Sequence, residues 1–204
     1  MTPPTNPHIT HVDNLPSIIS EGGLWSDAER LRRRVGVTAI GYQHIKARRL
    51  RRAVPVAARG VVGEYVPFNF CPRSVMLYVI HQGHAGYAGG QRPIVHLVSS
   101  VQAVVALGLK WAFTDRHAEL GFTAFFDDLA KLDAVSWELM PLTYWADPDV
   151  KERRQAEFLV HQHCPWTAVT HIGVIDHNMQ LRVETLLNSV SHRPQVLVRP
   201  DWYY

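Results

Sequence analysis

Short segments rich in β-branched and aromatic residues alternate with short helical patterns along the chain, and this alternation most constrains the fold. The pattern predicts about six strands, at residues 60–70, 93–98, 110–114, 156–161, 167–175 and 195–200. It predicts helices at residues 14–21, 26–34, 45–53, 99–107, 147–155 and 179–190. A short strand precedes the first helix, and residues 74–80 fit a strand or a helix equally well. Strands with interspersed helices indicate an α+β fold.

Length and composition narrow the class of protein. A chain of 204 residues, 47% hydrophobic and 19% charged, is typical of one globular domain with a full core. The longest nearly apolar run, residues 101–109, is too short to span a bilayer. The Pro-rich start predicts a loose segment and carries no secretory pattern, and two cysteines suit a reducing compartment. We therefore expect a cytoplasmic protein with no membrane partner.

The cations are unevenly distributed. Residues 30–63 hold ten of the 21 Lys and Arg residues and no Asp or Glu, and five cations lie between Lys46 and Arg52. A solvated helix face normally mixes signs, so an unmixed block suits a phosphate-bearing partner better. A plain solvent-facing helix remains the alternative.

Aromatic residues gather in a second segment. Residues 111–145 contain eight of the 20 aromatic side chains, in a part of the chain with few regular elements. They can form a core cluster, or they can stack with unpaired bases. Taken with the basic block, the second reading favours single-stranded nucleic acid over a duplex. Neither a Gly-x-Gly-x-x-Gly pattern nor a Walker loop is present.

Three groups of residues are candidates for chemistry. Glu157 begins an apolar strand, so its carboxylate either tops the sheet in solvent or points into a cleft. The histidines around Cys164 could suggest a metal, but they lack an established ligand spacing, so we expect none. Cys71 is followed by Pro72, with no feature that would lower its pKa, and fits a buried hydrophobe better than a nucleophile.

Several motifs occur in an order that resembles a known family. They run from His8 to Tyr204 and read HITHVDNLPSII, IKARRL, VGEYVPFNFCPRSVMLY, FTDRHA, AEFLVH and VLVRPDWYY. In this order they are similar to the DarT family, the toxin halves of bacterial toxin–antitoxin pairs, which are DNA ADP-ribosyltransferases. The resemblance implies an ADP-ribosyltransferase (PARP-like) fold with two facing antiparallel sheets and a cleft for NAD+.

The resemblance also implies a reaction and partners. ADP-ribose would pass from NAD+ to a thymine in single-stranded DNA, with release of nicotinamide. A neighbouring antitoxin with a macrodomain would remove the modification. Residues 1–204 would form one domain, with residues 35–53 as a helical element over NAD+ and residues 116–157 as the substrate loop.

The family's functional residues carry over to positions in this chain. Glu157 would be the catalytic glutamate and Arg48 the catalytic arginine, pointing into the cleft. The contacts to the dinucleotide would come from Thr10, His11, Val12, Ile19, Asp27 and Arg48. His117 would face the base, while Arg49, Arg51 and Arg52 would lie outward, toward DNA phosphates or solvent.

The chemistry fits these roles. Breaking the bond between nicotinamide and ribose creates a cationic transition state that a carboxylate stabilises. Arginine keeps its proton in proteins, so it suits electrostatic stabilisation better than proton removal. Two alternatives remain: a module that only binds single strands, and an NAD+-dependent enzyme that acts on RNA, another base or water.

Overall fold

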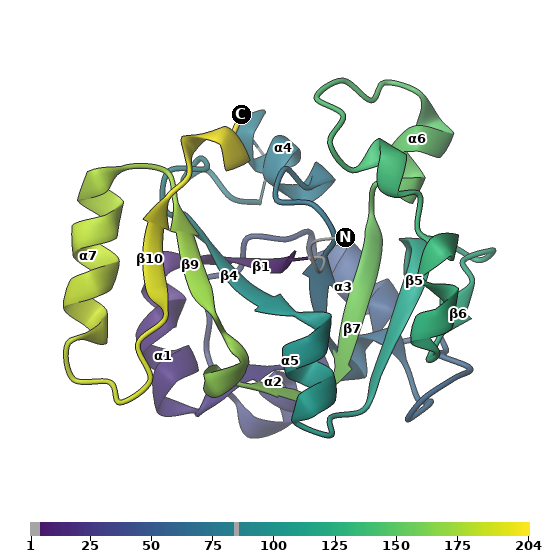
Figure 1. Cartoon of the computed structure of the whole chain (residues 1–204), viewed down its shortest axis with the longest axis horizontal. Helices are drawn as coiled ribbons and strands as arrows, with labels where there is room; N and C mark the ends of the chain where they lie inside the picture. Colours follow the sequence, from purple (N-terminus) through teal and green to yellow (C-terminus); the bar gives the residue numbers. More distant parts are fainter. Residues whose placement is uncertain (1–4, 84–85) are drawn as a thin grey trace.

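The computed structural model describes residues 5–83 and 86–204, in which two four-stranded sheets stand side by side (Figure 1). The first sheet has the order β1-β4-β9-β10, formed by Thr5–His11, Ile94–Ser100, His171–Val174 and Gln195–Val198. The second has the order β3-β7-β5-β6, formed by Tyr65–Asn69, Ala156–His161, Trp111–His117 and Phe125–Phe126. A small ribbon pairs β2 and β8, Gly23–Trp25 and His163–Pro165.

Seven α-helices surround the sheets within the described residues. They are α1 Leu15–Ser20, α2 Asp27–Arg33, α3 Gln43–Arg49, α4 Val75–His81, α5 Val101–Ala106, α6 Pro148–Arg153 and α7 His177–Leu187. Ser26, Ser74, Ser100, Asp147 and Asp176 cap five of them by accepting a backbone N–H with the side chain. Helix α7 covers the outer edge of the first sheet, and α6 stands above the second (Figure 1). None of the helices in the described part is long and apolar enough to cross a membrane.

Strand pairing confirms the mixed α and β architecture and refines it. All pairings in the second sheet are antiparallel, but β9 and β10 run parallel because α7 connects them as a crossover. Pro67 lies in β3, the edge strand of its sheet, where its missing N–H costs no ladder hydrogen bond. Strands β1 and β3 lie beside each other where the two sheets meet.

The described chain has ten strands where the sequence predicts about six. Three of the additional strands, β2, β6 and β8, are only two or three residues long, too short to show a period. The short strand expected before the first helix is β1, which begins at Thr5 and pairs with β4 along its length, so the expected loose start is wrong for residues 5–8. Residues 1–4 lie outside the described residues. The ambiguous segment at residues 74–80 is helix α4. The segment at 167–170 is not a strand, because a 3-10 turn at Trp166–Ala168 precedes β9.

The core lies between the sheets and the helices that pack on them. Leu97 and Ile172 of the first sheet and Phe113 and Phe158 of the second are fully buried. The aromatic segment is divided: Phe113 stacks with Phe126 inside the protein, as expected for a core cluster, whereas Phe122 and Tyr144 lie outside the core, 65% and 82% exposed. This core holds the first residues of β7 rigidly, where the candidate site lies.

Candidate active site

Glu157, the second residue of β7, lies at the end of the second sheet, and its carboxylate is buried. Strand β5 pairs with β7 on the side away from β3, and its register shifts between Phe113 and His117. In this irregular stretch Thr114 Oγ1 accepts the Glu157 N–H at 2.9 Å, and the Ala118 N–H donates to Glu157 Oε1 at 3.3 Å. Irregularities of this kind often reorient side chains beside active sites.

Arg49 lies opposite this carboxylate. It is the last residue of α3, and its two terminal nitrogens donate to the two oxygens of Glu157, each at 2.8 Å. The side chains are 10% and 6% exposed. A two-point pair of this kind fixes direction as well as charge, and removing one partner would leave a buried charge without compensation.

Each residue of the pair shifts the pKa of the other toward its charged form. Burial by itself would raise the pKa of Glu157, but the charge and hydrogen bonds of Arg49 outweigh it and hold the pKa below its usual range. Burial would likewise lower the pKa of Arg49, but Glu157 outweighs it and the pKa is raised. The site therefore contains a carboxylate that stays charged and a guanidinium that keeps its proton.

The placement of the basic run corrects the prediction for two arginines. Arg48, expected in the cleft, has a side chain that is 58% exposed and pairs with Glu119, while Arg49, expected outside, points inward. The reason is helical phase, since neighbouring residues of an α-helix point about 100° apart. A sequence signal was present, because Tyr42, Ile45 and Arg49 are spaced by three and four residues and all line the cavity.

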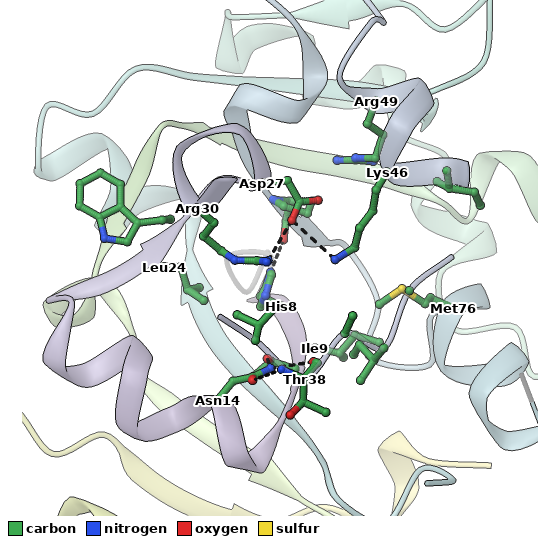
Figure 2. A pocket seen from close by; sticks show the side chains of 18 of the residues that line it. His8, Ile9, Asn14, Leu24, Asp27, Arg30, Thr38, Lys46, Arg49 and Met76 are labelled. Atoms are coloured by element: carbon green, nitrogen blue, oxygen red, sulfur yellow. Dashed lines mark hydrogen bonds and ion pairs between the residues drawn. The ribbon is translucent and has the colours of Figure 1, made fainter. Parts of the chain in front are cut away.

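A cavity of about 270 Å³ extends from this pair toward the N-terminal residues. Figure 2 shows Asp27 between Arg30 and Lys46, with oxygen to nitrogen distances of 2.9 and 3.6 Å. Further along, Asn14 accepts the Thr38 N–H at 2.8 Å and donates to the Thr38 carbonyl at 3.1 Å (Figure 2). Residues 35–41, most of which line the cavity, form neither helix nor strand, so only Gln43–Arg49 of the predicted helical element is helical.

The predicted dinucleotide contacts are divided by the structure. Thr10 and Asp27 line the cavity. Val12 is fully buried in the main core and Ile19 packs against that core, so neither side chain reaches the cavity. His11 faces Tyr87 with ring centroids 6.0 Å apart and accepts the Asp13 N–H. Strand alternation explains the difference, because Thr10 and His11 point to opposite faces of β1.

His117, expected to face the base, lies beside Glu157. Its ring lines the cavity, with Nε2 3.9 Å from Glu157 Oε1. Arg51 and Arg52 lie outside the cavity, as expected. Arg51 is exposed, whereas Arg52 donates to the Gly121 carbonyl at 3.1 Å and lies over the Phe125 ring.

The histidines and cysteines have structural partners. His163 stacks on Trp25 at 4.0 Å between centroids, and His161 packs near Tyr65. In the described part of the chain, no three His, Cys, Asp or Glu residues are grouped to hold a metal ion. Cys71 is buried, and burial raises the pKa of its thiol, consistent with a packing role.

Sequence reasoning missed several residues that line the cavity. They include Asn14, Met76 and Gln155, while Thr38 and Lys46 had been placed only as members of the predicted element at residues 35–53. Gln155 had no distinct signal, because it ends the predicted helix at 147–155 and lies in the turn before β7. Asn14 and Thr38 had none, since only the fold brings residues 24 positions apart into contact.

Comparison with known proteins gives consistent matches across the chain. A family model described as "ssDNA thymidine ADP-ribosyltransferase, DarT" matches residues 7–204. A "DNA ADP-ribosyl transferase" of Thermus aquaticus is 46% identical, covering 97% of this chain and 87% of that protein. A transferase–glycohydrolase fusion protein of Thermosipho africanus is 25% identical, covering 89% of this chain and 45% of the fusion.

Solved structures of one relative match over the full length. The DarT of Thermus sp. 2.9 with ADP-ribosylated single-stranded DNA has a TM-score of 0.94 and 42% identity, covering 100% of this chain and 98% of that one. Its complex with NAD+ has a TM-score of 0.90 and 40% identity, covering 100% and 99%.

Proposed function

The chain belongs to the DarT family and is a DNA ADP-ribosyltransferase, and on that premise we propose that it transfers ADP-ribose from NAD+ to a thymine base in single-stranded DNA, releasing nicotinamide. The observation that carries this proposal is the buried pair of Arg49 and Glu157 at the wall of an open cavity. A module that only binds nucleic acid has no need of a buried carboxylate held ionised at such a place.

The cavity carries groups suited to NAD+. Lys46 and Arg30 supply cations for a pyrophosphate, and both now pair with Asp27, which a dinucleotide could displace or share. The irregular segment of residues 35–41 contributes backbone groups and apolar side chains along the same wall. Among the predicted contacts, Thr10 and Asp27 remain in this role, while His11, Val12 and Ile19 would act by supporting β1 and α1.

Glu157 is the proposed catalytic carboxylate. Departure of nicotinamide leaves positive charge on the ribose, and a fixed anion beside it lowers the barrier. The described residues donate one hydrogen bond to Oε2, so this oxygen keeps a lone pair for a ribose hydroxyl. Because the carboxylate is already oriented by Arg49 and Ala118, little reorganisation is needed when the charge develops.

Arg49, in place of Arg48, is the proposed catalytic arginine. Its planar guanidinium holds Glu157 at two points and lines the cavity, where the carbonyls of a thymine could receive its remaining N–H groups. Its role is electrostatic: it fixes the carboxylate and stabilises negative charge on the imide.

The exposed arginines near α3 are the proposed DNA contacts. Arg51 is exposed, and Arg52 holds Gly121 next to the exposed ring of Phe122. This arrangement places a cation for phosphate near an aromatic face for a base. Residues 116–157 would thus act as the substrate loop within one domain spanning residues 1–204, with residues 35–53 on the NAD+ side.

Replacing Arg51 tests this surface. We expect Arg51→Ala to weaken binding of single-stranded oligonucleotides of every sequence alike, and to reduce the salt slope of log affinity by about 0.7, as for one lost phosphate contact. Fluorescence anisotropy at several salt concentrations measures both. Arg193→Ala, an exposed arginine after α7, is the matched control. An unchanged slope would remove Arg51 from the DNA surface.

The biological setting follows from the family. We propose that the chain is the cytoplasmic toxin half of a toxin–antitoxin pair. Its partner would carry a macrodomain-type DNA ADP-ribosyl glycohydrolase, an activity that the Thermosipho africanus protein joins to its transferase in one chain.

The central test uses four single-stranded DNA oligonucleotides, each lacking one base, and matched RNA. With NAD+, we expect the mass of one ADP-ribose to be added to every DNA strand that contains thymine and to no other. Nicotinamide should appear in equal amount above any hydrolysis without DNA. Modification of RNA, of thymine-free DNA, or of nothing would overturn the proposal and favour one of its alternatives.

A further inference from the structure

The proposed reaction needs a proton acceptor that neither member of the ion pair can supply. Thymine offers its ring nitrogen N3 as a nucleophile only after the imide proton has left. Arg49 keeps its proton, because Glu157 raises its pKa against the effect of burial. Glu157 is a poor base, because Arg49 holds its pKa below the usual range and three N–H groups already donate to it.

His117 is the nearest group with a suitable nitrogen. It is the last residue of β5, it lines the cavity, and its side chain is 18% exposed. Nε2 lies 3.9 Å from Glu157 Oε1, beyond hydrogen-bond distance, so this nitrogen makes no hydrogen bond to that carboxylate. Substrate in the cavity would therefore meet this edge of the ring.

Glu119 stands behind the ring. Its Oε2 lies 4.0 Å from Nδ1 of His117, also beyond hydrogen-bond distance, so it acts on the ring through its charge. Its side chain is only 12% exposed. Arg48 holds it from α3, with Nε paired to Oε1 and Nη2 donating to Oε2 at 3.3 Å. Arg48, although it lies outside the cavity, therefore fixes the carboxylate of Glu119 beside the His117 ring inside it.

We propose that His117 accepts the N3 proton of thymine, and that Glu119, anchored by Arg48, orients the ring with its Nδ1 proton toward the carboxylate. The inference rests on the proposed function and adds to it the group that accepts the proton of thymine. The N3–H bond breaks and its proton passes to Nε2, while the N3 electron pair forms the bond to the ribose carbon. The bond from that carbon to nicotinamide breaks, its electron pair leaves with neutral nicotinamide, and His117 later releases the proton to water.

The charges around His117 agree with this role. Burial lowers its pKa, as do Arg49 and Arg48 of α3, while Glu157 of β7 and Glu119 of its own loop raise it. The net direction is downward, so the ring is neutral at neutral pH and can accept a proton. Activity should fall on acidification, as the ring becomes protonated before substrate binds.

A thymine analogue with a more acidic N3 proton gives the sharpest test. We expect His117→Asn to lower transfer to thymine by about 10²–10⁴-fold, the usual effect of removing a general base. Release of nicotinamide without DNA should stay within several-fold of wild type, because water can attack the ribose carbon without first losing a proton, whereas N3 of thymine cannot. An oligonucleotide with 5-fluorouracil in place of thymine has a more acidic imide. The ratio of activity on this oligonucleotide to activity on the thymine oligonucleotide should be at least ten times larger for the variant than for wild type.

Equal losses on thymine and 5-fluorouracil would overturn the role of His117 as base. The wild-type protein tests the proposed function separately. If wild type does not modify thymine, the proposed function is refuted, whereas the role of His117 is tested by comparing the variant with an active wild type. Glu184→Gln, an exposed carboxylate on α7 and outside the proposed substrate loop, should behave as wild type on both oligonucleotides.

Glu119→Gln tests the positioning role. Removing this anion lowers the pKa of His117 further, so the acid limb of the rate profile should move to lower pH while the maximal rate falls about tenfold. In combination with His117→Asn, Glu119→Gln should cost nothing more, because both act on one proton transfer. An unmoved acid limb, or an additive loss in the double variant, would separate Glu119 from the base.

Discussion

Glu157→Gln should reduce transfer to DNA by about 10²–10³-fold or more, the loss found when a preorganised electrostatic group is removed. The substitution keeps the size and one oxygen of the side chain but removes the negative charge. Transition-state stabilisation should therefore fall much more than NAD+ binding. Mass spectrometry of a thymine oligonucleotide measures the first, and calorimetric titration with NAD+ the second.

The variant also loses its ion pair with Arg49, which is buried. A buried charge left alone costs up to about 3–5 kcal/mol, and the amide oxygen recovers part of this. A thermal melt must therefore accompany the assay. Glu184→Gln, exposed on α7, is the control for charge alone. A folded Glu157→Gln protein with more than a tenth of wild-type transfer would remove this carboxylate from the chemistry.

The main elements of the fold were predictable because their signals are local. The Ser and Asp caps, the Pro at the first turn of α6 and the apolar runs of β4 and β7 each act within a few residues. The short strands β2 and β8 carry no such signal. They form because Trp25 and His163 stack across the ribbon, and the fold supplies that contact.

The position of Glu157 at the cavity was predictable, whereas that of the inward arginine was not. Glu157 is the second residue of β7, and the period of two along the strand fixes its face. Arg48 and Arg49 are chemically identical neighbours in a run of cations, so only helical phase separates them. Ile45, four residues before Arg49, indicates which face of the helix points inward. The charge of the run identifies the basic block but does not show which of its arginines points inward.

The roles of these two arginines make the second large prediction. Arg49→Lys keeps the charge but replaces a planar fork with a single point, so it cannot hold both oxygens of Glu157. We expect transfer to fall by about 10²-fold and the melting temperature to drop. Arg48→Lys keeps a cation beside Glu119, and we expect a loss of several-fold at most.

The pH profile separates the role of Arg49 from a packing effect. Arg49 lowers the pKa of both His117 and Glu157, so a weaker partner lets both rise, and the residual activity of Arg49→Lys should be lost at a higher pH on acidification than that of wild type. This shift is opposite to the one expected for Glu119→Gln. Arg92→Lys, an exposed arginine paired with Asp176, controls for the substitution itself and should match wild type. Should Arg48→Lys lose activity while Arg49→Lys retains it, the catalytic arginine would be Arg48 after all, and the inward guanidinium would serve only to neutralise a buried acid.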